Sequence, residues 1–300
     1  MRASVPKPRA TIVVNPVAGR GRSRGVAGDL QERLATLGVE TDIVQPAAGR
    51  TRQAVRERLT DDGTTVVACG GDGTVHEVMQ GVLGTEAAFG IAPCGTGNDI
   101  ATVLGMRDPQ RLAQSIAAGR TRTVDAGGVS WGDREDHFLG VLSTGFDSTV
   151  NERANAMRWP TGRARYLASV VAELGRFRAR HYTVVIDGTP MTGHALLVCV
   201  ANAGTYGGGM RVCPDARVDD GALDITWVED IPRGEFLRVL PRVFSGSHVR
   251  HPAVRTFRCS AATIHAEGQI AYADGERLGP LPIRVAARPG ALRVVDTAVA

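Results

Sequence analysis

The sequence predicts an α/β domain followed by a mainly β domain. Up to about residue 126, short β-branched runs alternate with segments of helical apolar spacing, which is the rhythm of a parallel sheet. After Gly127 and Gly128 the chain changes to strand-rich segments separated by Gly, Pro and Asp turns, as in antiparallel sheets. We therefore expect a three-layer α/β domain over residues 1–126 and a β-sandwich domain over residues 127–300, whose last residues could pack back on the first domain.

Each element follows from a local pattern. The first helix carries Val26, Leu30, Leu34 and Leu37 at helical spacing and should end at Gly38. In the first domain the other expected elements are strands at 11–14, 39–44, 65–69 and 88–92 and helices at 51–60 and 74–83. In the second domain they are strands at 138–143, 182–186, 195–202, 223–228, 255–259 and 263–266 and helices at 147–157, 162–179 and 233–244.

The small excess of positive charge argues against a nucleic-acid partner. The formal net charge is only +4, and no basic-aromatic module is present. An anionic small molecule or an anionic membrane surface fits this balance equally well. Lys7 is the only lysine, so nearly all of the positive charge is arginine.

The five cysteines predict neither a disulfide framework nor a zinc site. Their number is odd, they are widely spaced and no C-x-x-C pair occurs, so reduced buried thiols are expected. The N-terminal segment lacks the apolar region of a signal peptide, and no run of about 18 apolar residues occurs. The resulting expectation is a cytoplasmic protein.

Three glycine-rich turns follow three of the predicted strands. They are NPVAGRG at 15–21, GGDGT at 70–74 and PCGTGND at 93–99. Open α/β sheets bind ligands at the carboxyl ends of their strands, so these turns should converge in space. Glycine lets backbone N–H groups approach a phosphate, and a helix after the turn adds a favourable dipole. One such turn could be a plain strand-to-helix connection, but three together indicate a phosphate site.

Asp72 indicates that the ligand is a magnesium nucleotide. A carboxylate among glycines would repel bare phosphate unless a divalent cation mediated the contact. Two common nucleotide motifs are absent, because a P-loop requires a lysine after its glycines and a Rossmann turn requires a third glycine where Arg24 stands. The arginines at 20–24 could touch phosphate or form a solvated charged turn.

Four segments in this order make the interpretation specific. They are GGDGTVHEV (70–78), PCGTGNDIA (93–101), YGGGMRVCPDARVDDGALDI (206–225) and ADGE (273–276). They resemble the successive motifs of the soluble diacylglycerol kinase catalytic-domain family, whose domain sphingosine and ceramide kinases share, and the resemblance spans essentially the whole chain. It implies an ATP-dependent lipid kinase that makes a lipid phosphate such as phosphatidic acid. The GGDGT segment alone would also fit an NAD kinase or another small-molecule kinase, and a nucleotide-sensing protein without turnover is a further alternative.

The resemblance assigns ligand contacts to individual positions. Nucleotide contacts fall on Asn15, Pro16, Val17, Ala18 and Gly19, on Gly70, Gly71, Asp72, Gly73, Thr74, Val75 and His76, and on Thr96. Asp72, Asp99 and Asp125 would help to organise metal and water. Mg²⁺ would be held by the Asp220 carboxylate and by the carbonyls of Arg217 and Ala222.

Two positions depart from the family pattern. Many relatives have Asn at the position of His76, and a strand-end Thr that contacts nucleotide in some relatives aligns with about Gln45 or Pro46. Nucleotide preference could therefore differ from that of relatives. His76 could equally be a first-turn helix residue without a ligand role.

The resemblance also places a catalytic base in the segment Asp274-Gly275-Glu276. Phosphoryl transfer needs a group that accepts the proton of the alcohol, and either carboxylate is a candidate. The alternative interpretation is a type I′ hairpin turn, because Asp-Gly is a standard hairpin signal.

Residues 153–180 are the expected peripheral membrane contact. Seven arginines alternate there with Trp159, Tyr166, Phe177 and aliphatic residues, a basic amphipathic pattern suited to anionic headgroups. A core-packed helix with a solvated arginine face is the alternative. The protein would then sit transiently at the inner membrane surface, and a homodimer is left open.

Overall fold

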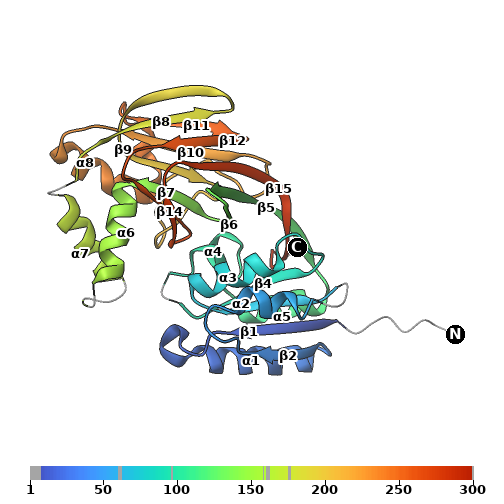
Figure 1. Cartoon of the computed structure of the whole chain (residues 1–300). Coiled ribbons are helices and arrows are strands. Elements are labelled where there is room, and N and C mark those ends of the chain that lie inside the picture. Colours follow the sequence, from blue (N-terminus) through green and yellow to red (C-terminus); the bar gives the residue numbers. More distant parts are fainter. Residues whose placement is uncertain are drawn as a thin grey trace. The chain divides into compact units, whose positions relative to one another are not determined.

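The chain forms two compact units. The structure, a computed structural model, describes residues 8–59, 63–95, 97–157, 159, 163–174 and 177–298. Unit 1 comprises Met1–Val124 and Gly290–Ala300, and unit 2 comprises Asp125–Pro289 (Figure 1). Unit 1 is thus built from both ends of the chain. The predicted combination of a parallel α/β part and an antiparallel β part is confirmed.

Unit 1 contains a parallel sheet in the order β2-β1-β3-β4-β15, of which Figure 1 labels β1, β2, β4 and β15. Its strands are β1 (Arg9–Val14), β2 (Glu40–Val44), β3 (Thr65–Gly70), β4 (Ala88–Pro93) and the end of β15 (Ile283–Val295), where Arg293 and Val294 pair with Ala88 and Phe89. The β3 strand is buried along its whole length, as expected for a strand covered by helices on both faces.

The helices of unit 1 form the two outer layers. They are α1 (Ser23–Thr36), α2 (Thr51–Arg56), α3 (Asp72–Val82), α4 (Asp99–Val103) and α5 (Pro109–Ala117). The chain moves from β1 outward to β2 and then back across β1 to β3. Because parallel crossovers are right-handed, this reversal puts α1 and α2 on opposite faces. The packing agrees, since α1 contacts α5 while α2 contacts α3.

This reversal of direction defines the ligand end of the sheet. The β1 and β3 strands are adjacent, but the connections that follow them leave in opposite directions. At such a switch point the two strand ends leave room for a ligand between the loops that follow them. Asn15 and Gly70 stand at these two ends, which are the positions of the first two glycine-rich turns.

Unit 2 is built from antiparallel pairings. Its strands are β5 (Thr121–Trp131) from Asp125 onward, β6 (Arg134–Phe138), β7 (Val141–Gly145), β8 (Arg180–Ile186), β9 (Thr189–Ala201), β10 (Leu223–Glu229), β11 (Val254–Cys259), β12 (Ala261–His265), β13 (Ile270–Ala273), β14 (Glu276–Pro280) and the first part of β15. The long β9 strand pairs with β8, β7 and β10. The rings of Trp227 and Tyr182 pack edge to face in the core between these strands, with 5.9 Å between their centroids.

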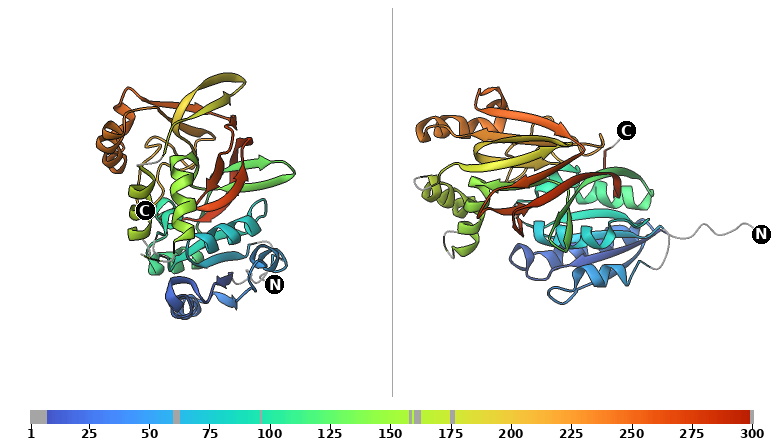
Figure 2. Two further views of the ribbon diagram at one scale, coloured as in Figure 1. Left: turned by 60° about the vertical axis from the view of Figure 1, so that its left-hand side comes forward. Right: turned by 45° about the horizontal axis from the view of Figure 1, so that its top comes forward.

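Helices gather at one end of the unit 2 sheet (Figure 2). They are α6 (Phe146–Ala156), α7 (Arg163–Leu174), α8 (Arg233–Val239) and the 3-10 turns η2 (Leu240–Ser245) and η3 (Ser247–Arg250). Unit 1 has the 3-10 turn η1 (Ala18–Gly21). Within the described ranges, no helix has the length and apolarity needed to cross a membrane.

Two predicted elements of unit 2 are divided in the structure. The strand expected at 138–143 is two strands, β6 and β7, because the backbone at Leu139 and Gly140 turns to bind the Asp274 carboxylate. The helix expected at 233–244 is α8 followed by η2. Pro241 explains this change, since proline lacks the N–H that a continuing α-helix requires.

Candidate functional site

The three glycine-rich turns of unit 1 come together at the switch point. The Asn15 side chain donates to the Thr74 hydroxyl at 3.2 Å, and the Asn15 backbone N–H donates to the Cys69 carbonyl. The Asn15 carbonyl accepts the hydroxyl hydrogen of Ser23 at 2.6 Å, which holds the start of α1 against the same turn. Asn15 therefore joins the end of β1 to the beginning of α3.

Asp72 joins the second turn to the third. One carboxylate oxygen accepts the backbone N–H of Asn98, and the other accepts the backbone N–H of Asp99, both at 3.1 Å. Asn98 has a left-handed backbone (φ 58°), which turns the chain into α4. Burial raises the pKa of Asp72, and the neighbouring Asp99 carboxylate raises it further, while the two N–H groups act in the opposite direction. Asp72 is thus a clamp between two loops.

The amino end of α3 remains available for an anion. The first turn of an α-helix has N–H groups without partners inside the helix. At α4 the Asp72 carboxylate takes two such groups, whereas α3 begins after Gly71, and no side chain caps it in the described part of the chain. The N–H groups at 72–74 and the helix dipole together favour a phosphate at this position.

Close backbone contacts explain several of the glycines. Gly19 has φ 59°, and a Cβ atom there would stand 2.4 Å from the Cys94 carbonyl oxygen. A Cβ atom on Gly95 would stand 2.8 Å from the Cα of Gly71. Larger residues would force the turns apart, so the packing of the turns requires glycine at these positions.

Two thiols lie directly behind these turns. The sulfur atoms of Cys69 and Cys94 are 3.5 Å apart and buried. Hydrogen bonding from Cys69 and the nearby Arg22 charge lower the pKa of the Cys94 thiol, while the same hydrogen bond and burial raise the pKa of Cys69. The cysteines of the chain are free, as expected from their number and spacing.

The remaining nucleotide candidates differ in their exposure. Val17 is 80% exposed, while Val75 and His76 are 4% exposed and lie on the inner side of α3. The imidazole of His76 contacts the Gln80 amide at 3.4 Å. This burial is what the interpretation of His76 as a helix residue without a ligand role expects. Thr96 lies outside the described residues.

In unit 2 the segment 217–222 folds around a buried carboxylate. The Asp125 side chain, which is 4% exposed, accepts the backbone N–H of Gly221 at 2.7 Å. The Asp125 backbone N–H donates to the Val218 carbonyl at 2.6 Å. Asn202 donates to the Asp125 carbonyl and to the Leu139 carbonyl, each at 3.0 Å. Asp125 therefore shapes the loop on which the predicted metal ligands lie.

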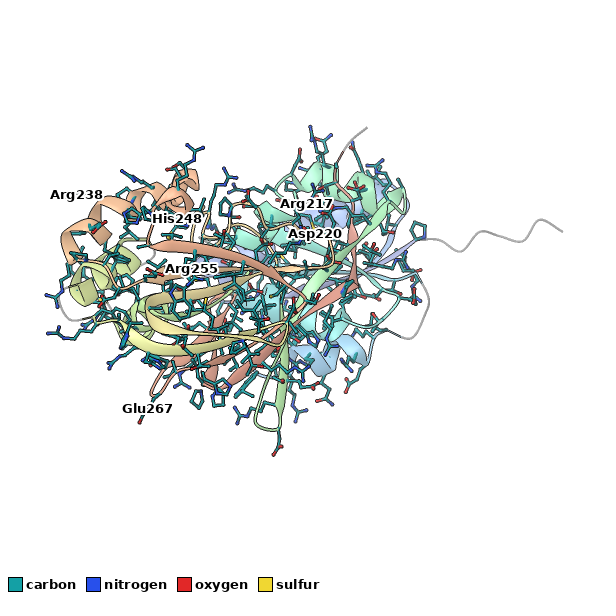
Figure 3. All side chains as sticks on the ribbon, turned by 90° about the horizontal axis from the view of Figure 1, so that it is seen from above. Arg217, Asp220, Arg238, His248, Arg255 and Glu267 are labelled. Carbon is teal, nitrogen blue, oxygen red and sulfur yellow. The ribbon has the colours of Figure 1, made fainter. Side chains whose placement is uncertain are left out.

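Asp220, the predicted carboxylate ligand of this loop, is labelled in Figure 3, and Arg258 lies beside it. One of its oxygens lies 2.8 Å from the Arg258 guanidinium, and the other accepts the backbone N–H of Ala222 at 3.3 Å. Burial raises the pKa of the adjacent Asp224, an effect that Arg258 opposes and that Asp220 and Asp215 reinforce. Arg258 thus balances Asp220, while Arg217 pairs with Asp219 in the same loop at 3.2 Å.

Asp274 occupies a hairpin turn and binds backbone. It has φ 50° and is followed by Gly275 with φ 85°, the pair of left-handed residues found in a type I′ turn. Its carboxylate accepts the N–H groups of Leu139, Gly140 and Val141 at 2.8, 2.8 and 3.1 Å. The geometry of the alternative interpretation, a type I′ hairpin, is therefore present, and the carboxylate fastens that hairpin to the β6–β7 connection.

Glu276 differs from Asp274 in being exposed. It is the first residue of β14 and pairs with Ala273 across the hairpin. The hairpin is also held from α6, because the Tyr272 hydroxyl and the Arg277 guanidinium each donate to Glu152 at 2.7 Å. These two hydrogen bonds lower the pKa of Glu152. Glu276 thus stands on a well-anchored turn with its carboxylate directed away from the core.

Several of these structural residues were not anticipated. Asn98, Arg258 and Glu152 act through partners that are 26 or more positions away, so a local pattern could not reveal them. For Asn98 the sequence did contain a usable signal, because asparagine in a glycine-rich turn favours the left-handed conformation. The arginine-rich segment 153–180 is described only in part, since Arg158, residues 160–162, Gly175 and Arg176 lie outside the described residues.

Comparison with known proteins identifies the class. Residues 9–129 match the diacylglycerol kinase catalytic domain, and residues 140–296 match the YegS C-terminal NAD kinase beta sandwich-like domain. A diacylglycerol kinase of Mycobacterium tuberculosis is 37% identical over 96% of this chain and 94% of its own. A diacylglycerol kinase of Bacillus subtilis is 25% identical over 91% of each chain.

The fold has a solved counterpart. A crystal structure of a diacylglycerol kinase from Bacillus anthracis covers 96% of this chain and 97% of its own, with a TM-score of 0.73 and 22% identity. Together these findings define a phosphotransferase that acts on an alcohol group. The chain belongs to the diacylglycerol kinase family, which also confirms the resemblance inferred from the sequence motifs.

The contact between Gly19 and Cys94 can be tested with one methyl group. Gly19→Ala should lower stability by about 1–3 kcal/mol more than Gly21→Ala. Both positions have positive φ, but a Cβ atom on Gly21 meets nothing within 4 Å, so the difference isolates the clash with the Cys94 carbonyl. Urea unfolding of both variants measures it, and equal losses would show that the turns do not need this close approach.

The role of Asp274 as a backbone clamp predicts a loss of stability on Asp274→Asn. The amide has only one acceptor oxygen for three N–H donors, so the variant should lose about 1–3 kcal/mol. Asp133→Asn, at an exposed turn, is the control and should change stability little. Urea unfolding measures both, and an Asp274→Asn protein as stable as the parent would contradict the clamp.

Proposed function

We propose that this protein transfers the γ-phosphate of ATP to the hydroxyl of diacylglycerol or a similar lipid, giving phosphatidic acid or the corresponding lipid phosphate. The observation that carries the proposal is the arrangement of the three glycine-rich turns around the amino end of α3. The identity to a diacylglycerol kinase over nearly the whole chain supports the lipid acceptor.

The nucleotide phosphates are proposed to bind at the turns of unit 1. The N–H groups at 72–74 supply hydrogen bonds and the α3 dipole supplies partial positive charge. Gly19 and Gly70 let the turns pack closely, because a Cβ atom there would meet the Cys94 carbonyl oxygen or the Thr74 side chain. Gly73 places no side chain beside the neighbouring N–H groups. Asp72 keeps the turns at 70–74 and 93–99 at a fixed separation, so that the donors are in place before the nucleotide arrives.

Glu276 is the proposed proton acceptor, with Asp274 as a positioning residue. A general base needs a carboxylate oxygen that can reach the hydroxyl of the acceptor. The Asp274 oxygens accept three backbone N–H groups, so they already serve to hold the β6–β7 connection. Glu276 is exposed two positions further along the same turn. The anchored hairpin would therefore present Glu276, while Asp274 keeps the hairpin in place.

The segment 217–222 is the proposed Mg²⁺ site. Its donor set of the Asp220 carboxylate with the Arg217 and Ala222 carbonyls is all oxygen, which suits this cation. Mg²⁺ bound to a kinase supplies charge neutralisation for phosphate oxygens. Arg258 competes for Asp220, because its guanidinium already balances that carboxylate. Asp125 would hold the loop in the same shape with or without the metal.

An acceptor panel tests the activity. The purified protein is incubated with Mg²⁺ and ATP labelled at the γ-phosphate, together with micelles of diacylglycerol, ceramide or sphingosine, or with NAD in solution. We expect label in phosphatidic acid. Label in NAD phosphate would favour the NAD kinase alternative, and nucleotide binding without label in any acceptor would favour a sensing protein.

The assignment of the base predicts different effects at neighbouring carboxylates. Glu276→Gln should lower kcat by roughly 10²- to 10⁴-fold without a change in stability. Glu267→Gln is the control, since it changes the same group at another exposed turn of unit 2 (Figure 3). Steady-state kinetics and urea unfolding are measured together. Full activity of the Glu276→Gln protein would refute the assignment.

If Arg258 competes with Mg²⁺ for Asp220, substitutions of Arg258 and of Asp220 should have opposite effects on Mg²⁺ binding. Arg258→Met should tighten Mg²⁺ binding, on the order of tenfold, because Asp220 loses its counter-ion. Asp220→Asn should abolish that binding. Arg255→Met is the control, since Arg255 lies on the same strand and pairs instead with Glu229 at 3.9 Å. The readout is the Mg²⁺ dependence of the melting temperature, and unchanged dependence in the Asp220→Asn protein would place the metal elsewhere.

A further inference from the structure

The segment from α8 to η2 has one buried side and one exposed side. Phe236, Val239 and Val243 are 6–8% exposed and pack inward. The exposed residues between and just after them are Leu237, Arg238, Pro241, Arg242 and Phe244. We name these five residues the α8–η2 face. Its large apolar side chains are well exposed, since Leu237 is 50% and Phe244 58% accessible.

The buried side holds this face in a fixed position. Phe236 contacts Phe146 of α6 edge to face at 5.1 Å, and Phe146 contacts Phe177 in the same manner at 5.3 Å. Val254 and Leu196 complete the same apolar cluster. The exposure of Leu237 and Phe244 therefore does not come from poor packing of the segment, because the buried side of the same segment packs against α6.

The charge of the face is positive. Arg238 and Arg242 stand one helical turn apart, and Arg233 begins the same helix. Arg238 extends outward from the end of the unit (Figure 3). Glu235 is the only carboxylate between Arg233 and Arg250 in the sequence, and it pairs with the His251 imidazole at 2.9 Å. The outward charge is thus that of arginines.

Leucine, proline and phenylalanine set among arginines suit an interface between water and lipid. The apolar side chains can enter the boundary of the acyl region, while the guanidinium groups remain with anionic headgroups.

We propose that the α8–η2 face is the surface with which this protein contacts an anionic lipid bilayer. The choice of a bilayer as the partner rests on the proposed function, which requires a lipid acceptor. The inference moves the main membrane contact from the segment 153–180 to residues 233–245. It predicts that binding depends on both the arginines and the two exposed apolar side chains.

Vesicle binding tests the face directly. The full chain is sedimented with vesicles of phosphatidylcholine containing phosphatidylglycerol and, separately, with vesicles of phosphatidylcholine alone. We expect binding to the anionic vesicles that falls with added salt. Arg238→Glu with Arg242→Glu should weaken it by on the order of tenfold or more, and Leu237→Ser with Phe244→Ser should weaken it comparably. Because the altered side chains are exposed, both variants should unfold at the same urea concentration as the parent protein.

Two control proteins separate this face from other surfaces. Arg134→Glu with Ile43→Ser changes an exposed arginine and a partly exposed apolar residue elsewhere, and its binding should equal that of the parent. Arg180→Glu with Val171→Ser changes the segment 153–180, where Val171 is 66% exposed. Loss of binding in this second protein, together with unchanged binding in the α8–η2 variants, would overturn the inference.

Activity without a bilayer separates this inference from the proposed function. With short-chain diacylglycerol dissolved as monomers, both α8–η2 variants should retain parent activity, whereas with vesicles they should lose it. Failure of the parent on both substrates would count against the lipid kinase and leave the vesicle result standing. A dimer in sedimentation velocity that Leu237→Ser with Phe244→Ser dissociates would show a second copy as the occupant and overturn the membrane contact.

Discussion

The Asp72 carboxylate is the interaction on which the ligand end of unit 1 depends. It accepts the N–H groups of Asn98 and Asp99 and thereby fixes the third glycine-rich turn against the second. The same contacts use the helix N–H groups of α4, so of these two helices α3 is the one whose amino end can meet an anion. The Asp72 carboxylate thus sets the distance between the second and third turns, and it also determines which of the two helix ends can bind an anion.

Carboxylates in unit 2 are used in the same manner. Asp125 holds the segment 217–222, Asp274 holds the β6–β7 connection, and Asp187 accepts the N–H groups of Ser260 and Ala261 at a second hairpin. Charge-assisted hydrogen bonds to backbone are stronger than neutral ones. They stabilise turns that must keep a shape without a large apolar core. An acidic residue in a turn of this chain is therefore incomplete evidence for catalysis or metal binding.

This structural use of carboxylates limits what could be predicted from the sequence alone. Helical and strand periodicity and the glycine-rich turns were enough to predict the α/β rhythm and the meeting of the turns, because these follow from local patterns and from the geometry of parallel sheets. The motif at 274–276 could not separate Asp274 from Glu276, since the difference arises from contacts with residues more than 130 positions away. Pro241 was visible in the sequence, and its effect on the helix at 233–244 could have been anticipated.

The sharing of β15 by both units has a consequence for synthesis on the ribosome. Unit 2 is one uninterrupted stretch of chain, whereas the sheet of unit 1 is complete only when Arg293 and Val294 pair with Ala88 and Phe89. Until Arg293 and Val294 emerge, β4 is an open edge strand with unpaired backbone groups. The nascent protein therefore carries an unfinished parallel sheet while the roughly 200 residues between Pro93 and Arg293 are synthesised.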